Sequence, residues 1–172
     1  SRAVSIEAGN WKQLNTQGSL PVARGLGVYG GGYRGMAVFH AERIEEIGRK
    51  AKEKGLDGAI LVMHYPTPAD AGRITEKGLG AMMAEKGGLR AHGASIARGD
   101  KIHAIVGVEG LAVDITTCMG LLGKEELREG DILSLDCSPE KGFVYRGKLP
   151  YQEDAEAVSG PLSQGDIAGS SP

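Results

Sequence analysis

Short apolar runs separated by glycines are the feature that most constrains how this 172-residue chain folds. Residues 59–63 read Ala-Ile-Leu-Val-Met, a continuous apolar run typical of a buried strand. The chain holds 28 glycines, whereas aromatic residues make up only 5% of it. Because glycines permit tight turns and close backbone approaches, this pattern favours a compact α/β domain over a helical bundle.

Helical and strand-like segments alternate along the chain. Residues 41–54 carry isoleucines at helical spacing opposite a charged face, which predicts an amphipathic helix. Thr67 is suited to cap a second helix, with Pro68 at its first position. The other predicted elements are strands at 35–39, 59–63, 79–84, 103–108, 131–136 and 142–145, a short helix at 92–98 and a helical turn within 121–128. Strands mixed with few short helices predict a layered α/β domain.

The two ends of the chain differ in composition from its centre. Residues 1–20 are polar and predict an irregular segment, whereas residues 21–151 hold the predicted folded body. Residues 152–172 are rich in Ser, Gly, Pro and acidic residues, which is typical of a linker or a tail. The first residues, Ser-Arg-Ala-Val, lack an initiator Met and a signal-peptide pattern, so we expect a fragment or a processed chain.

Charge and cysteine content exclude several classes of protein. The net charge of −2 gives no electrostatic basis for binding nucleic acid or an anionic membrane. No apolar run approaches the roughly 20 residues that span a bilayer. Cys118 and Cys137 are isolated in the sequence, which predicts reduced, buried thiols in a cytosolic protein, with a disulfide as the alternative. His40, His64 and His103 share no metal-ligand spacing, so we interpret them as structural histidines.

The segment most informative about chemistry contains Gly87, Gly88 and His92, with the histidine at the start of the predicted helix. Glycines in such a turn leave backbone N–H groups pointing into open space, and the first helical turn adds more unpaired donors. Anions bind at such helix ends. Since a free imidazole has a pKa of about 6.5, its neutral form is a nucleophile at pH 7. The pattern therefore predicts a histidine that accepts a phosphoryl group.

Residues 85–98, Glu-Lys-Gly-Gly-Leu-Arg-Ala-His-Gly-Ala-Ser-Ile-Ala-Arg, resemble the phosphohistidine motif of the PEP-utilising enzymes. That motif has two glycines, a small residue before the histidine, small residues after it, and a closing Ala-Arg. The flanking segments at 60–70, 105–108 and 129–145 also resemble the family's pattern, so the resemblance covers about residues 25–147. The family includes pyruvate phosphate dikinase, phosphoenolpyruvate synthase and phenylphosphate synthase.

The resemblance implies a layered β/β/α swivelling domain that carries a phosphoryl group on His92. The group would be collected at an ATP-grasp domain or subunit and delivered at a barrel domain or subunit that binds pyruvate or PEP. The implied phosphate-binding residues are Gly88, Arg90, Gly93, Ala94 and Arg98. The chain offers no carboxylate cluster for a metal, so Mg²⁺ and ATP are expected on partner domains, and we expect no activity from this chain alone.

Two departures from the family's pattern leave the acceptor open. Arg90 and Ala91 stand where many members carry Thr and then Ser or Cys. Arg90 is interpreted as a solvated side chain or a phosphate contact, and Arg98 as a phosphate ligand or a charge that pairs with the helix dipole. A phenylphosphate-synthase-like carrier with a hydroxyl acceptor and a non-catalytic interaction module are the alternatives.

A run of glycines at 30–32 is the other candidate for binding a ligand. It could cradle a nucleotide phosphate, but it lacks the Lys-Ser/Thr of a phosphate-binding loop. We therefore predict a tight turn at the surface.

Overall fold

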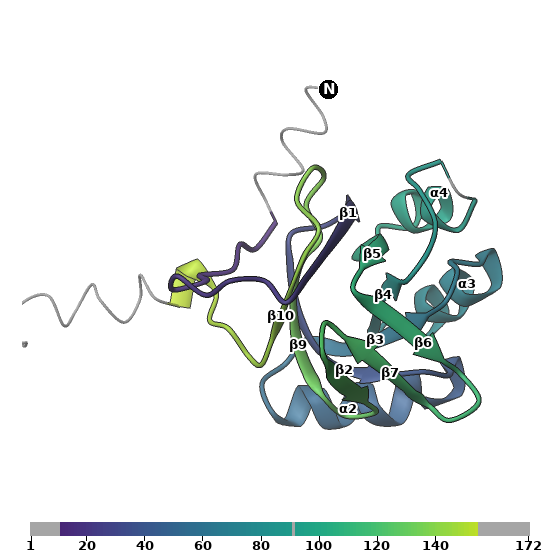
Figure 1. The fold of residues 1–172 in the computed structure, drawn as a ribbon, viewed down its shortest axis with the longest axis horizontal. Coiled ribbons are helices and arrows are strands. Elements are labelled where there is room, and N and C mark those ends of the chain that lie inside the picture. The colour runs from purple at the N-terminus through teal and green to yellow at the C-terminus, as the bar shows by residue number, and fades with distance from the viewer. Residues whose placement is uncertain (1–10, 91, 155–172) are drawn as a thin grey trace, which may run out of the picture.

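The computed structural model describes residues 11–90 and 92–154, and within them the predicted mixed α/β class is confirmed (Figure 1). The main sheet closes into a barrel in the order β1-β10-β9-β2-β3-β4-β5. Strands β2 to β5 run parallel to one another, and the other pairs are antiparallel. The strands are β1 (Ala23–Tyr29), β2 (Gly32–Val38), β3 (Gly58–Met63), β4 (Gly80–Ala84), β5 (Ala104–Glu109), β9 (Ile132–Asp136) and β10 (Phe143–Arg146).

Helices cover the parallel part of this sheet, on one side of the molecule (Figure 1). They are η1 (Ala41–Arg43), α2 (Ile44–Glu53), α3 (Pro68–Lys77) and α4 (His92–Gly99). The predicted cap of α3 is confirmed, because the Thr67 hydroxyl accepts a hydrogen bond from the Asp70 amide at 3.1 Å. The helix ends at Gly78, whose φ of +69° suits glycine.

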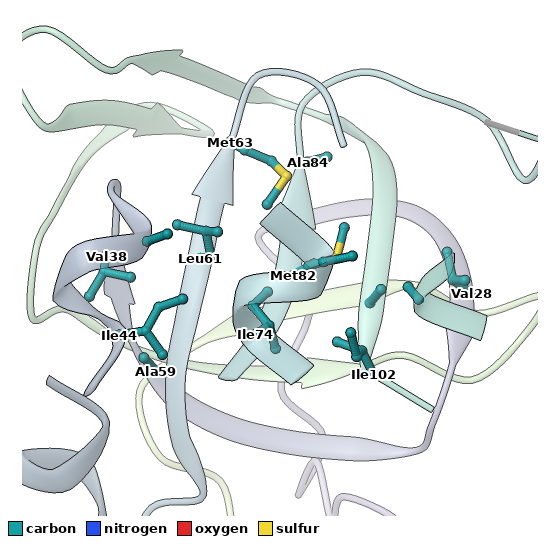
Figure 2. Close-up of a cluster of buried hydrophobic side chains, with 14 of the residues drawn as sticks. Val28, Val38, Ile44, Ala59, Leu61, Met63, Ile74, Met82, Ala84 and Ile102 are labelled. Carbon is teal, nitrogen blue, oxygen red and sulfur yellow. The ribbon is translucent and has the colours of Figure 1, made fainter. Parts of the chain in front are cut away.

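Strand β3 shows how the sheet separates two apolar layers. Ala59, Leu61 and Met63 pack beneath the helices, and Figure 2 shows this layer with Ile74 of α3 above the strands. The alternate residues, Ile60 and Val62, point into the barrel. Since successive side chains of a strand point to opposite faces, a strand buried on both faces needs the continuous apolar run seen in the sequence.

A small antiparallel sheet corrects one prediction. It consists of β6 (Leu111–Asp114), β7 (Met119–Leu122) and β8 (Glu125–Arg128), so the helical turn predicted within 121–128 is wrong. Gly123, with a φ of +66°, and Lys124 form a two-residue turn in which Leu122 pairs with Glu125. Buried Leu122 and Leu127 pack against the barrel side of the core. Because this packing buries both leucines in the same core, residues 119–128 form two strands and not a helical turn.

The glycine run at 30–32 does form the turn between β1 and β2, but it is buried, not at the surface as predicted. A Cβ atom on Gly30 would lie 2.4 Å from the His103 ring, and one on Gly31 would lie 2.4 Å from the Lys12 carbonyl oxygen. Neighbouring segments therefore fill the space that a nucleotide phosphate would need.

The two ends of the described chain pair with each other. Leu14 and Tyr151 form an antiparallel bridge, and the Asn15 amide donates to the Pro150 carbonyl at 2.8 Å. The Tyr151 hydroxyl donates to the Asp57 carboxylate at 2.5 Å. Asp57 lies just before β3, so the paired ends lie at the amino edge of the parallel strands, on the far side of the barrel from α4 (Figure 1).

Replacing Tyr151 with phenylalanine is expected to lower the free energy of unfolding by about 1–3 kcal/mol, because the Asp57 carboxylate loses the hydroxyl donor and keeps the Arg34 amide at 2.9 Å as its hydrogen-bond donor. Burial and the hydrogen bond to Asp57 raise the pKa of Tyr151, so its hydroxyl stays a donor at neutral pH. Denaturant unfolding measures the effect. Tyr65→Phe is the control, since Tyr65 is 53% exposed. Equal stabilities of the two variants would contradict the predicted role of the Asp57 contact.

The stability of the domain is expected to fall as the pH drops below about 6.5, in part through His103. His103 is largely buried beside the Tyr33 ring, 5.2 Å between centroids, and this burial lowers the pKa of His103 although Asp57 opposes the shift. The unfolded chain then binds a proton more readily than the folded chain in this pH range. Unfolding curves between pH 7.5 and pH 5 should show a smaller loss of stability in His103→Gln than in the unchanged chain. An identical loss of stability in both proteins would exclude His103 as a cause of the pH dependence.

Candidate functional site

The candidate site lies at the carboxyl edge of the parallel strands, where α3 and α4 both begin. Pro66, which follows β3, contacts Gly93 at the start of α4. At the other end of the two helices, the Thr75 hydroxyl lies 3.2 Å from the Asp100 carboxylate. The helices therefore run side by side in the same direction. In α/β proteins, both open sheets and barrels, the carboxyl edge of the parallel strands is where ligands commonly bind.

His92 is the first residue of α4, and its side chain is exposed. Within residues 11–90 and 92–154, no hydrogen bond or ion pair engages its ring. The first turn of a helix leaves N–H donors unpaired and carries the positive end of the helix dipole. An exposed imidazole ring therefore lies beside groups that favour added negative charge.

Close packing on Pro66 fixes where α4 begins. A Cβ atom on Gly93 would lie 2.7 Å from the carbonyl carbon and oxygen of Pro66, closer than real Cβ contacts. Ala94 and Ala97 are fully buried against the same layer. These small residues bring the first turn of α4 close to the rest of the protein.

Two glycines, one in the loop after β4 and one in β5, hold the base of the loop that precedes His92. Gly87 has a φ of +103°, and Gly107, inside β5, has a φ of +59°. The Gly107 amide donates to the Lys86 carbonyl at 3.2 Å. A Cβ atom on Gly107 would lie 2.8 Å from the Gly87 carbonyl oxygen. Gly107 was not predicted as part of the site, although a glycine within an apolar strand indicates a bulge or a close approach.

The remaining predicted phosphate-binding residues occupy different settings. Arg98 donates to the Leu89 carbonyl at 3.1 Å and approaches the Ser95 hydroxyl at 3.4 Å, so it links α4 to the preceding loop. Arg90 is exposed and has no hydrogen-bond or ion-pair partner among the described residues. Around Gly88, no atom lies within 4 Å of where a Cβ would point. The site is therefore open to solvent at Gly88 and Arg90.

A carboxylate that sequence reasoning missed lies at the same edge. Glu85 accepts a hydrogen bond from the Val113 amide at 3.1 Å, and the same oxygen lies 3.1 Å from His64 Nδ1. Glu85 thus ties the end of β4 to the small sheet. Within the described residues, no group of three His, Cys, Asp or Glu side chains is placed to hold a metal ion.

One family of proteins matches the central part of the chain. Residues 55–139 match the family described as PEP-utilising enzyme, mobile domain. The match runs from the start of β3 past β9 and includes the whole loop that carries His92. This chain therefore belongs to the mobile-domain family of PEP-utilising enzymes.

Similar proteins are pyruvate, phosphate dikinases. The chain is 33% identical over 134 residues to that of Entamoeba histolytica, covering 77% of this chain and 14% of the relative. It is 32% identical over 146 residues to pyruvate, phosphate dikinase 2 of Zea mays, covering 85% and 15%. With the Rickettsia felis dikinase the identity is 27% over 136 residues, covering 78% and 14%. The chain thus spans about one-seventh of the length of these relatives. The described residues include no helix long and apolar enough to cross a membrane.

Proposed function

We propose that this chain is the phosphoryl-carrier domain of a dikinase-type phosphotransferase, with His92 as the phosphorylated residue. The observation that carries the proposal is the exposed His92 ring at the start of α4, within the segment that matches the mobile-domain family. His103, by contrast, is largely buried beside the Tyr33 ring, and His64 contacts Glu85.

In the proposed reaction a neutral imidazole nitrogen of His92 attacks phosphorus. For dikinase chemistry the N–P bond forms at the β-phosphorus of ATP as the bond from that phosphorus to the leaving AMP breaks, and the other ring nitrogen gives up its proton. Transfer of the γ-phosphoryl group to phosphate or water then leaves the negatively charged β-phosphoryl group on the ring. The amides of Gly93 and Ala94, at the positive end of the helix, would stabilise this charge, together with the amide of Gly88. Because the P–N bond is easily broken, the group can be passed on.

The other parts of the reaction are assigned to partners. ATP and Mg²⁺ are expected on an ATP-grasp domain or subunit, and the acceptor on a barrel domain or subunit. The large remainder of the dikinase relatives leaves room for both. We expect the carrier to swivel between these sites in the cytoplasm, with no turnover by the carrier alone.

Arg90 is the reason for retaining a hydroxyl compound as a second candidate for the phosphoryl acceptor. It stands where dikinase-like members carry Thr, and it points into solvent beside the nucleophile. The proposed carrier role is the same for pyruvate or PEP and for a hydroxyl acceptor of the phenylphosphate-synthase kind, because the acceptor is chosen by the partner.

A labelling experiment tests the proposal. The full chain is mixed with the ATP-binding domain of its own enzyme and with ATP labelled on either the β or the γ phosphorus. Dikinase chemistry predicts that the β label reaches the chain and remains after the γ phosphate has been released. Label that comes only from the γ position would indicate a simple kinase, and no label from either position would contradict the carrier role.

A further inference from the structure

Helix α4 turns only one side of its first two turns to solvent. Gly93, Ala94 and Ala97 are buried, whereas His92 and Ser95 are exposed. Residues three positions apart on a helix lie on the same face, with their Cβ atoms about 5–6 Å apart. Ser95 is therefore the next polar side chain on the face that presents His92.

The direction of side chains on a helix brings the Ser95 hydroxyl toward the start of α4. In an α-helix the Cα–Cβ bonds tilt toward the amino terminus, so a side chain covers the turn that precedes its own Cα. For Ser95 the preceding turn begins at His92. A phosphoryl group bound to the His92 ring would therefore lie on the side of α4 that the Ser95 hydroxyl reaches.

Arg98 binds the oxygen of this hydroxyl and leaves its proton free. Arg98 Nη2 lies 3.4 Å from Ser95 Oγ and donates to the Leu89 carbonyl at 3.1 Å. Because a guanidinium group has no acceptor, the Ser95 oxygen accepts in this contact. Within residues 11–90 and 92–154, the Ser95 O–H donates to no other group. An unpaired O–H donor beside a bound cation favours an anion as its partner.

We propose that Ser95 is a ligand of the phosphoryl group on His92 and that it prolongs the life of the phosphohistidine between two active sites. It rests on the carrier role of His92. The Ser95 O–H donates to a phosphoryl oxygen, and the phosphoryl oxygens carry most of the negative charge of the group. In the loose transition state of phosphoryl transfer the group resembles metaphosphate, because negative charge has moved toward the leaving nitrogen. The hydrogen bond therefore stabilises the phosphorylated ground state more than the transition state for loss to water.

The test uses two variants of similar shape that differ in the hydroxyl. Ser95→Thr and Ser95→Val both introduce a branched Cβ, but only threonine keeps the donor. The full chain and each variant are phosphorylated with phosphoramidate, which releases ammonia as the N–P bond to His92 forms. Phosphorus NMR then follows the loss of the phosphohistidine signal. The half-life should be about fivefold shorter in Ser95→Val, whereas Ser95→Thr should stay within about twofold of the unchanged chain.

Two further variants are controls. Ser95→Ala removes the hydroxyl without adding a branched Cβ and should shorten the half-life as Ser95→Val does. Thr75→Val on α3 removes a hydroxyl that donates to the Ala71 carbonyl at 3.0 Å, and it should leave the half-life unchanged. Equal half-lives of Ser95→Val and Ser95→Thr would overturn the role of the Ser95 hydroxyl and leave His92 a carrier. If neither phosphoramidate nor the enzyme's own ATP-binding domain with Mg·ATP phosphorylates the unchanged chain, the carrier role fails and the role of Ser95 fails with it.

Discussion

Replacing His92 with asparagine is expected to abolish phosphoryl labelling of the chain. The asparagine amide is polar and of similar size, but it is not a nucleophile at neutral pH. Because His92 is exposed and has no partner among the described residues, its loss should change the free energy of unfolding by less than about 0.5 kcal/mol. Labelled phosphate bound per chain and a denaturant unfolding curve, measured on the same sample, separate lost chemistry from lost folding.

His64→Asn is the control for this experiment. His64 lies at the same edge of the sheet, with its side chain 56% exposed, and contacts Glu85 instead of the α4 terminus. It should retain most of the labelling. If His92→Asn were fully labelled and His64→Asn were not, His64 would be the phosphorylated residue.

Gly93→Ala is expected to lower both the stability of the domain and the rate at which His92 is labelled. The new methyl group would meet the Pro66 backbone at 2.7 Å, and backbone cannot move aside cheaply. We expect a loss of about 1–3 kcal/mol of stability as α4 is pushed off the strands. His92 is the neighbouring residue, so its displacement should slow labelling on the order of 10–100-fold even under conditions where the variant is folded. Single-turnover labelling and unfolding curves measure the two effects.

The other end of α4 supplies a matched control. Gly99→Ala makes the same chemical change in the same helix, at a position where no atom lies within 4 Å of the added Cβ. It should leave the labelling rate unchanged and leave stability equal or raise it by up to about 1 kcal/mol. If Gly99→Ala and Gly93→Ala behaved alike, contact with Pro66 would not be what positions His92.

Local sequence patterns predicted those parts of the fold that depend on near neighbours. The cap at Thr67 and the buried strand at 59–63 follow from side chains within a few residues of each other, and both are confirmed. The strands at 119–128 were mistaken for a helical turn because their identity is set by burial of Leu122 and Leu127 against a distant part of the barrel. Pairing of Leu14 with Tyr151 likewise joins residues from the two ends of the chain, which no local pattern reveals.

The same distinction applies to the candidate site, where some residues share one local segment and others meet only through contacts between distant segments. The glycines and His92 lie in one short segment, so their joint position could be predicted from the sequence. Glu85 and Gly107 reach the site through contacts with Val113 and Gly87, across strands that the sequence does not show to be adjacent. Arg98 was considered as a phosphate ligand or a dipole partner, and its contact with the Leu89 carbonyl adds a third role, in holding the loop.

Locating the phosphate on the labelled chain is the most direct test of the carrier role. Trypsin cleavage after Arg90 and Arg98 releases residues 91–98, which contain a single histidine, His92. Mass spectrometry at neutral to alkaline pH should find the phosphate on this peptide, stable to base and lost in acid. An acid-stable phosphate, or one on a different peptide, would contradict phosphoryl transfer through His92.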